Sequence, residues 1–234
     1  MKSPADETGM VEQETDSRIT YPCYKSFDEF IDVERLKSLD RFLTEKVAEH
    51  LGAEKHGNFM NSHRLKSSTP ETPGQRVIYL TDSVRPFSYY DLDKPELWER
   101  TAKAGEFAPL MDFIETLSFK ATARMMIICD DLPRAVPAHR DHLSADICHD
   151  FIWFRTNLQK PFYVLNHKTD EKLYVESYSA WFDTVNQFHG SDPREGISFS
   201  IRVDGQFTQE LKNQIPQPAF NAASAPALWA CASG

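Results

Sequence analysis

The stretch from Ile197 to Asp204 reads ISFSIRVD and alternates apolar and polar residues throughout. Successive side chains of a strand point to opposite faces of a sheet, so one face of this stretch is apolar. The other face carries Ser198, Ser200, Arg202 and Asp204. A strand with hydroxyls and charges on its second face either borders solvent or lines a polar pocket.

Shorter runs rich in β-branched and aromatic residues precede this strand, each bounded by Pro, Asp, Gly or Asn. They cover residues 123–129, 151–158, 162–165, 173–177 and 180–184. Short strands at such intervals are typical of a β-sandwich or barrel, such as a jelly roll. The sequence therefore predicts a β core over about residues 120–207.

The half of the chain before this core has helical periodicity. Apolar residues recur every three or four positions over 27–51, and helices are also predicted over 95–105 and 108–117. The polar stretch 57–88 predicts a long loop, either a lid over a substrate or a surface excursion. We expect a mainly β protein with N-terminal helices, the helical part reaching to about residue 118.

The ends of the chain differ in composition from this domain. Residues 1–17 are polar and acidic and predict a disordered tail, while 216–234 predict a tail or a segment that wraps the core. A single domain over residues 18–215 is expected between them.

The bulk composition excludes several classes of partner. The formal net charge of -9 argues against nucleic acid or an anionic membrane as the main partner. No apolar run approaches the roughly 20 residues that span a bilayer, and the N-terminus does not resemble a signal peptide. The four cysteines show no CxxC spacing, so we expect reduced thiols and a cytoplasmic protein.

Two neighbouring residues in the run VPAHRDHL suggest a metal site. His139 and Asp141 are two positions apart, so on extended backbone they point the same way and can bind one cation. His189, in the run WFDTVNQFH, is predicted to follow a strand that lies beside this pair. Two imidazoles and a carboxylate leave coordination positions open, which is the facial triad of non-haem iron oxygenases.

A guanidinium lies close to this set in the chain. Arg202 follows His189 by 13 residues and shares a strand face with Ser200. A guanidinium with a neighbouring hydroxyl can hold a carboxylate with two hydrogen bonds. We therefore expect Arg202 and Ser200 to bind an anionic ligand beside the metal.

These residues resemble the Fe(II)/2-oxoglutarate-dependent dioxygenase superfamily over about residues 120–207. The runs HRDHL and WFDTVNQFH are most similar to the aspartyl/asparaginyl β-hydroxylase-like group, which includes bacterial proline hydroxylases. The resemblance implies a distorted double-stranded β-helix core that uses Fe(II), O2 and 2-oxoglutarate as co-substrate. It also implies that Arg202, Ser200 and Arg155 bind the co-substrate. The family's usual Arg-x-Ser order is reversed here, as Ser200-x-Arg202.

The same resemblance implies oxidation of an unactivated C–H bond, with release of succinate and CO2. Asp141 stands where halogenating members have a small residue, which favours hydroxylation, desaturation or cyclisation. A small molecule, an amino acid or a biosynthetic intermediate, is the expected substrate. Two alternatives remain open: a protein or peptide side-chain hydroxylase, and a cupin-like metal-binding jelly roll without 2-oxoglutarate. The oligomeric state is not predicted.

A few further residues are candidates for lesser roles. Trp153 and Asn157 share a strand face with Arg155, and His142 lies beside the metal pair, so these three are candidate substrate contacts. Asp183 and Asp204 are expected to serve as turn or cap residues.

Overall fold

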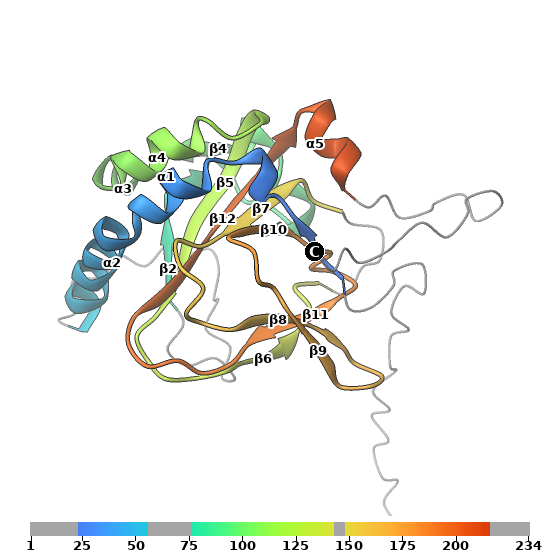
Figure 1. Ribbon diagram of the computed structural model, residues 1–234. Helices are drawn as coiled ribbons and strands as arrows, with labels where there is room; N and C mark the ends of the chain where they lie inside the picture. Colours follow the sequence, from blue (N-terminus) through green and yellow to red (C-terminus); the bar gives the residue numbers. More distant parts are fainter. Residues whose placement is uncertain (1–22, 56–75, 143–147, 216–234) are drawn as a thin grey trace, which may run out of the picture.

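The computed structural model describes residues 23–55, 76–142 and 148–215 (Figure 1). The predicted disordered tail at 1–17, the segment 216–234 and most of the predicted loop at 57–88 lie outside these residues. Within the described ranges, no helix is both long enough and apolar enough to cross a membrane.

Two antiparallel sheets form the body of the protein. The larger sheet has the strand order β1-β10-β7-β12-β5-β2, and the smaller has the order β6-β11-β8-β9. In chain order the strands of the larger sheet are β1 (Lys25–Ser26), β2 (Arg76–Tyr79), β5 (Phe119–Asp130), β7 (Phe151–Phe154), β10 (Ser179–Trp181) and β12 (Ser198–Phe207). Those of the smaller sheet are β6 (Val136–His139), β8 (Phe162–Asn166), β9 (Glu171–Tyr174) and β11 (Phe188–Ser191).

From β5 onward the chain passes back and forth between the two sheets. β5, β7, β10 and β12 belong to the larger sheet, while β6, β8, β9 and β11 belong to the smaller one. This winding is that of a double-stranded β-helix, or jelly roll. The predicted fold class, a mainly β protein with N-terminal helices, is confirmed.

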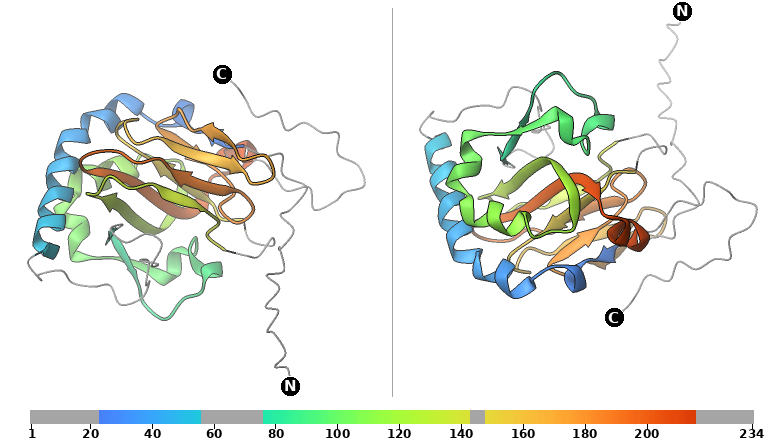
Figure 2. Two further views of the ribbon diagram at one scale, coloured as in Figure 1. Left: turned by 90° about the horizontal axis from the view of Figure 1, so that it is seen from below. Right: turned by 90° about the horizontal axis from the view of Figure 1, so that it is seen from above.

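The helices cover the outer face of the larger sheet (Figures 1 and 2). They are α1 (Val33–Ser38), α2 (Asp40–Lys55), α3 (Ala102–Glu106) and α4 (Ala108–Ile114), with α5 (Gln209–Gln214) after the last strand. Fully buried Leu43 and Phe113 from these helices join Ile201 of β12 in one apolar cluster. Burial of this face holds helices and sheet together.

Two of the helical predictions need correction. The helix predicted over 27–51 is broken: the 3-10 helix η1 (Asp28–Phe30) comes first, and Asp32 caps α1 by accepting a hydrogen bond from the backbone N–H of Arg35 at 2.9 Å. The helix predicted over 95–105 is interrupted by β4 (Trp98–Arg100), between η3 (Pro95–Leu97) and α3. Pairing with β3 (Thr81–Ser83) holds this stretch extended, a tertiary contact that local periodicity does not reveal.

The described end of the predicted loop 57–88 is also partly regular. Its residues include β2, which extends the larger sheet beside β5, and β3. The 3-10 helix η2 (Tyr89–Asp91) follows, capped reciprocally by Ser88 and Asp91. Strands therefore replace part of the expected loop, because β2 pairs with the edge of β5 and β3 pairs with β4.

The inner faces of the two sheets enclose a cavity of about 860 Å³. The alternation predicted for Ile197–Asp204 accounts for its floor. Ile201 and Val203 are fully buried toward the helices, whereas Ser198, Ser200 and Arg202 line the cavity.

Candidate metal centre

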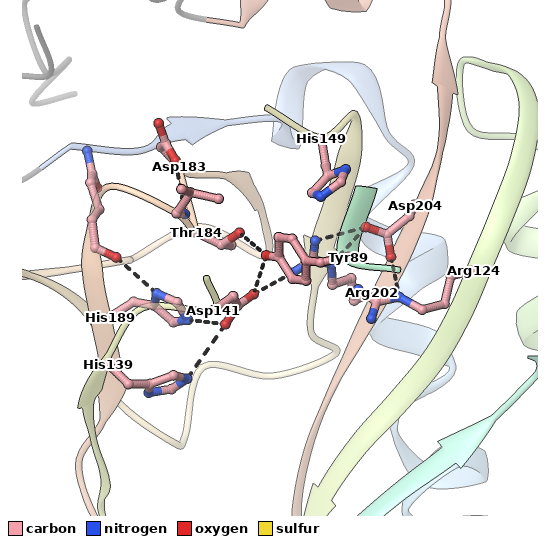
Figure 3. A network of polar contacts seen from close by, with 12 residues as sticks. Tyr89, Arg124, His139, Asp141, His149, Asp183, Thr184, His189, Arg202 and Asp204 are labelled. Carbon is pink, nitrogen blue, oxygen red and sulfur yellow. Dashed lines mark hydrogen bonds and ion pairs between the residues drawn. The ribbon is translucent and has the colours of Figure 1, made fainter. Parts of the chain in front are cut away.

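Two strands of the smaller sheet bring the three predicted metal ligands together. His139 ends β6 and lies directly across the sheet from His189 of β11. Asp141 follows two residues later, and its backbone N–H donates to the carbonyl of Thr184 at 2.8 Å. One ligand atom from each of His139, Asp141 and His189 lies within 4.8 Å of the other two (Figure 3).

The strand that carries His189 differs from the one predicted. The run expected to carry it, residues 180–184, contributes only to β10, which belongs to the larger sheet. After a turn at Asp183, the separate strand β11 carries His189. The strand predicted to carry His189 was therefore the wrong one. Asp183 accepts hydrogen bonds from the backbone N–H groups of Val185 and Asn186, and the turn that they form ends the predicted strand before His189.

Both imidazoles are oriented by the backbone. The Nδ1 atom of His139 lies 2.9 Å from the carbonyl oxygen of Pro137, and that of His189 lies 3.2 Å from the carbonyl oxygen of Gln187. When Nδ1 carries the proton, Nε2 is left with its lone pair. The two Nε2 atoms lie 3.7 and 3.3 Å from the same Oδ1 atom of Asp141. This is how a ligating histidine is held in metal sites.

Gly190 makes this close approach of strands possible. A Cβ atom there would lie 2.5 Å from the carbonyl oxygen of Val136 and 2.7 Å from the hydroxyl of Tyr163. Any larger residue would push β11 away from β6 or β8. The glycine that follows His189 therefore helps to place this candidate ligand.

The second oxygen of Asp141 is held from the other side. Its Oδ2 accepts a hydrogen bond from Nη1 of Arg202 at 2.9 Å and one from the hydroxyl of Tyr89 at 3.4 Å (Figure 3). Tyr89 also lies 3.1 Å from Oγ1 of Thr184. Oδ1 thus faces the imidazoles while Oδ2 is fixed by protein donors.

A buried ion network continues from Arg202 away from the ligands. Asp204 is fully buried and accepts from Nε and Nη2 of Arg202 at 3.0 and 2.9 Å. Its other oxygen accepts from Nε of Arg124 at 2.9 Å. Asp204 was expected to cap a turn, and that prediction was wrong: it joins two buried guanidinium groups, as a buried charge requires.

The protonation states suit metal binding. Partial burial lowers the pKa of His139, and the neighbouring His189 lowers it further, which favours the neutral imidazole. Burial acts to raise the pKa of Asp141, but the hydrogen bond and charge of His189 and the charge of Arg202 outweigh it and hold that pKa well below its usual range. Burial raises the pKa of Tyr89 to about 12, so its hydroxyl stays protonated and donates to Asp141.

The register of the larger sheet divides the cavity floor into rows. Arg202, which contacts Asp141, pairs with Met126 of β5 and Trp153 of β7 and so marks the middle row. On one side, Ser198 pairs with Asp130. We call this side the Ser198 end; it is lined by Asp130, Asn157, Lys160, Ser191, Ser198 and Ser200.

The opposite side of the cavity has a different character. We call it the Arg124 end; it is lined by Phe87, Ser88, Tyr89, Leu92 and Arg124, and Tyr79 borders it from the middle row, where it pairs with Met126. The backbone N–H of Arg124 donates to the carbonyl of Leu92, which ties β5 to the segment carrying η2. The candidate metal ligands lie between a polar end and a more aromatic end.

The residues predicted to bind the co-substrate occupy this cavity in different ways. Ser200 lines the Ser198 end, and Arg202 is engaged by Asp141 and Asp204. Arg155 also lines the cavity, but its nitrogens donate to the backbone carbonyls of Ser177, Lys160 and Val175. Burial lowers the pKa of Arg155 to about 10.

The candidate substrate contacts are spread around the site. Trp153 lines the cavity and stacks on Phe162 with ring centroids 4.5 Å apart. Asn157 lines the Ser198 end, and its amide donates to Asp40 of α2 at 2.6 Å. His142 stacks on Tyr89, with centroids 4.7 Å apart. None of these positions assigns a substrate role.

Three residues of the site were not singled out from the sequence: Tyr89, Arg124 and Lys160. Tyr89 contacts Asp141 across 52 positions of chain. Lys160 lines the Ser198 end, and its ammonium lies 3.5 Å from Oδ2 of Asp130. The sequence of β5 gives no signal for Arg124, because Met125, Met126, Ile127 and Ile128 make both of its faces apolar.

Comparison with known proteins gives distant structural similarities only. No protein-family model and no curated protein matches the sequence. The structure is similar to a Pseudomonas putida prolyl-4-hydroxylase, with 10% identity, a TM-score of 0.41, and coverage of 79% of this chain and 92% of that chain. It is also similar to a prolyl hydroxylase from Trichoplax adhaerens in complex with a hypoxia-inducible factor peptide, with 11% identity, a TM-score of 0.43, and coverage of 83% and 87%. Similarities at this level do not identify an activity.

Proposed function

We propose that this protein is a non-haem Fe(II) oxygenase that uses 2-oxoglutarate and O2 to oxidise a C–H bond of a small molecule. The observation that supports it most is the convergence of two Nε2 atoms on one carboxylate oxygen in a cavity. A cytoplasmic location stays a prediction that accompanies this proposal.

The donor set fits a ferrous ion on its own chemistry. Two imidazoles and one carboxylate form a borderline-to-hard set that suits Fe(II) and leaves further positions for other ligands. The three ligand atoms lie within 4.8 Å of one another, and the outer nitrogens of both imidazoles are already satisfied by carbonyls. His139, Asp141 and His189 would hold the ion. Bound there, it supplies oxygen activation coupled to decarboxylation of the keto acid.

The protein's own residues would position the reactants. Arg202 and Tyr89 hold Asp141 so that a single oxygen faces the imidazoles. Trp153, Phe162 and Phe182 line the cavity with apolar surface, which would favour the apolar part of a substrate. A second carboxylate, that of the keto acid, needs a cationic or hydroxyl-rich site nearby.

The Ser198 end suits that carboxylate. Ser191 and Ser198 are buried there, and the hydroxyl of Ser191 has no hydrogen-bond partner among the described residues. Arg202 and Arg155 remain the predicted cations. Lys160 is a third candidate, because its contact with Asp130 is long. We propose that Ser200 and one of these cations bind 2-oxoglutarate.

Succinate release tests the proposal. With Fe(II) under air, the protein is expected to convert 2-oxoglutarate to succinate, and Asp141→Ala is expected to abolish this and to lose metal binding. Asp192→Ala is the matched control, because that carboxylate pairs on the surface with Lys172. A protein that binds Fe(II) but neither binds nor consumes 2-oxoglutarate would favour the cupin-like alternative.

Substitution of each candidate cation identifies the residue that binds the carboxylate of 2-oxoglutarate. Lys160→Met, Arg155→Met and Arg202→Lys are compared for the dissociation constant of 2-oxoglutarate, measured without oxygen in the metal-loaded protein. Loss of a charge-assisted hydrogen bond is expected to weaken binding by about 10- to 100-fold in the variant that removes the true partner. A peptide hydroxylase would show turnover coupled to peptides and not to free small molecules.

A further inference from the structure

Arg124 is a buried charge whose known contacts leave part of it open to the cavity. The side chain is 5% exposed, and its Nε donates to Asp204. Among the residues that the structure describes, no hydrogen bond or ion pair is found for its two terminal nitrogens. The terminal nitrogens are not fully buried, because neither is among the buried atoms that lack a hydrogen-bond partner. Arg124 also lines the cavity. The terminal nitrogens therefore face the cavity.

Asp204 does not fully satisfy this guanidinium. Arg202 donates two N–H groups to one oxygen of Asp204, while Arg124 donates one to the other oxygen. Arg202 also has Asp141 as a second anion. Arg124 has no second anion among the described residues, so an anionic ligand at its terminal nitrogens would complete the site.

Tyr79 provides a second, independent observation. Its hydroxyl is buried with no hydrogen-bond partner among the described residues, although the side chain lines the same cavity. A buried hydroxyl without a partner costs free energy, so one retained beside a cavity suggests a ligand. Tyr79 pairs with Met126, two residues along β5 from Arg124, so the two side chains are diagonal neighbours on the sheet. Burial raises the pKa of Tyr79 to about 12, and the positive charge of Arg124 opposes that rise.

The hydrogen-bonding groups of Arg124 and Tyr79 indicate which kind of ligand would bind there. A planar guanidinium and a protonated phenol are both donors, and together they match the two oxygens of a carboxylate. Phe87 and Leu92 line the same end and favour an apolar portion in the rest of the molecule. The Arg124 end and the Ser198 end lie on opposite sides of the metal ligands, so a second carboxylate would have its own place.

We propose that the Arg124 end binds a carboxylate of the organic substrate through Arg124 and Tyr79, which makes the substrate a small carboxylic acid. The inference rests on the proposed oxygenase function. It assigns recognition of the substrate to β2 and β5, and leaves the co-substrate to the Ser198 end.

The test compares free acids with their amides. The full-length protein, loaded with Fe(II) and 2-oxoglutarate without oxygen, is titrated with the proteinogenic amino acids, small aliphatic carboxylic acids, and the corresponding primary amides. At least one free acid is expected to bind, with its amide about 10-fold weaker or more, since the amide lacks the charge that strengthens the hydrogen bonds.

Two variants locate the effect. Tyr79→Phe is expected to weaken binding of the acid by about 10-fold and to leave binding of the amide unchanged. The variant should keep its stability, because the hydroxyl has no hydrogen-bond partner to lose among the described residues. Arg124→Gln is expected to remove the preference for the acid. Tyr174→Phe and Arg100→Gln, both on the surface, are the matched controls.

The outcomes distinguish a failure of the proposed carboxylate site from a failure of the proposed oxygenase function. If metal-loaded protein does not bind 2-oxoglutarate, the proposed function fails. If 2-oxoglutarate binds normally but no free acid binds, or acids and amides bind alike, the carboxylate site is wrong. It is equally wrong if Tyr79→Phe binds the acid as well as the natural protein does, or if that variant loses affinity for 2-oxoglutarate instead.

Discussion

Arg202 donates a hydrogen bond from Nη1 to Oδ2 of Asp141 at 2.9 Å, on the side of the carboxylate away from the two imidazoles. The sequence predicts that this arginine clamps the co-substrate. In the structure its guanidinium is already engaged by Asp141 and Asp204, and it lies over the ring of Phe151 at 4.1 Å. Arg202 is therefore placed to orient Asp141, the carboxylate that we propose as a metal ligand.

Replacing Arg202 by lysine is expected to weaken metal binding. A lysine cannot bond Asp141 and Asp204 at once in the same plane, so Asp141 loses its orientation. Loss of an outer contact of this kind typically lowers metal affinity about 10- to 100-fold. Titration with Fe(II) or Mn(II) measures it, with Arg100→Lys as the surface control. Unchanged metal affinity together with weakened 2-oxoglutarate binding would assign Arg202 to the co-substrate instead.

Gly190→Ala is expected to disrupt the metal centre from within the sheet. The new Cβ would meet the carbonyl oxygen of Val136 at 2.5 Å, and that backbone atom belongs to the strand of His139. Separation of β11 from β6 moves His189 away from His139, so both metal affinity and stability should fall. Overpacking of this kind typically costs about 1–3 kcal/mol.

Gly105→Ala serves as the matched control, because no atom lies within 4 Å of a Cβ built there. In helix α3 this change is expected to be neutral or to stabilise by up to about 1 kcal/mol. Thermal unfolding and metal titration of both variants give the comparison. Normal metal binding by Gly190→Ala would show that the sheet tolerates the added methyl group.

Asp204→Asn is expected to destabilise the fold. The carboxylate is fully buried between Arg124 and Arg202, and an amide leaves two buried guanidinium groups without their shared counter-charge. Loss of one partner in a buried ion network costs about 3–5 kcal/mol. Chemical denaturation measures the free energy of unfolding. The surface variant Asp192→Asn should lose less than about 1 kcal/mol, and an equal loss in both would contradict the account.

His50 is expected to make the protein less stable in mild acid. Its imidazole contacts Glu106 at 3.1 Å and stacks on Phe107. Burial lowers its pKa, and the charge of Lys103 lowers it further. The unfolded chain therefore binds this proton more tightly, so stability falls as the pH drops through the unfolded value of about 6.5.

The free energy of unfolding at about pH 7.5 and about pH 5.5 tests this, in the natural protein and in His50→Gln. Carboxylates contribute at lower pH in both proteins, so the difference between them isolates His50. The variant should lose less stability on acidification. An equal loss in both proteins would assign the effect to other groups.

The fold was largely predictable because β12 and its neighbours follow simple alternation. Ile201 and Val203 face the helices and Ser200 and Arg202 face the cavity, as a period of two requires. The strand β4 was not predictable from Trp98–Arg100, because pairing with β3 holds it extended. Local periodicity does not contain that contact.

The three residues of the candidate metal centre were predicted as a set from their residue types, their order in the chain and the expected jelly roll. His139 and Asp141 are near neighbours, and the winding of the sheets brings His189 opposite His139. The contacts that orient them come from far along the chain: Tyr89 is 52 positions from Asp141 and Arg124 is 80 positions from Asp204. No pattern within a strand or helix predicts such pairs.

The two ends of the cavity come from different parts of the chain. The Arg124 end draws on residues 79–92, which precede the jelly roll, whereas Asp130, Asn157, Lys160 and the three serines of the Ser198 end come from the strands and turns of the jelly roll. Changes in the earlier segment can alter what is accepted there without touching the loops of the other end. In a set of related chains, variation in that segment would diversify the molecules accepted while the proposed oxidising centre is inherited unchanged.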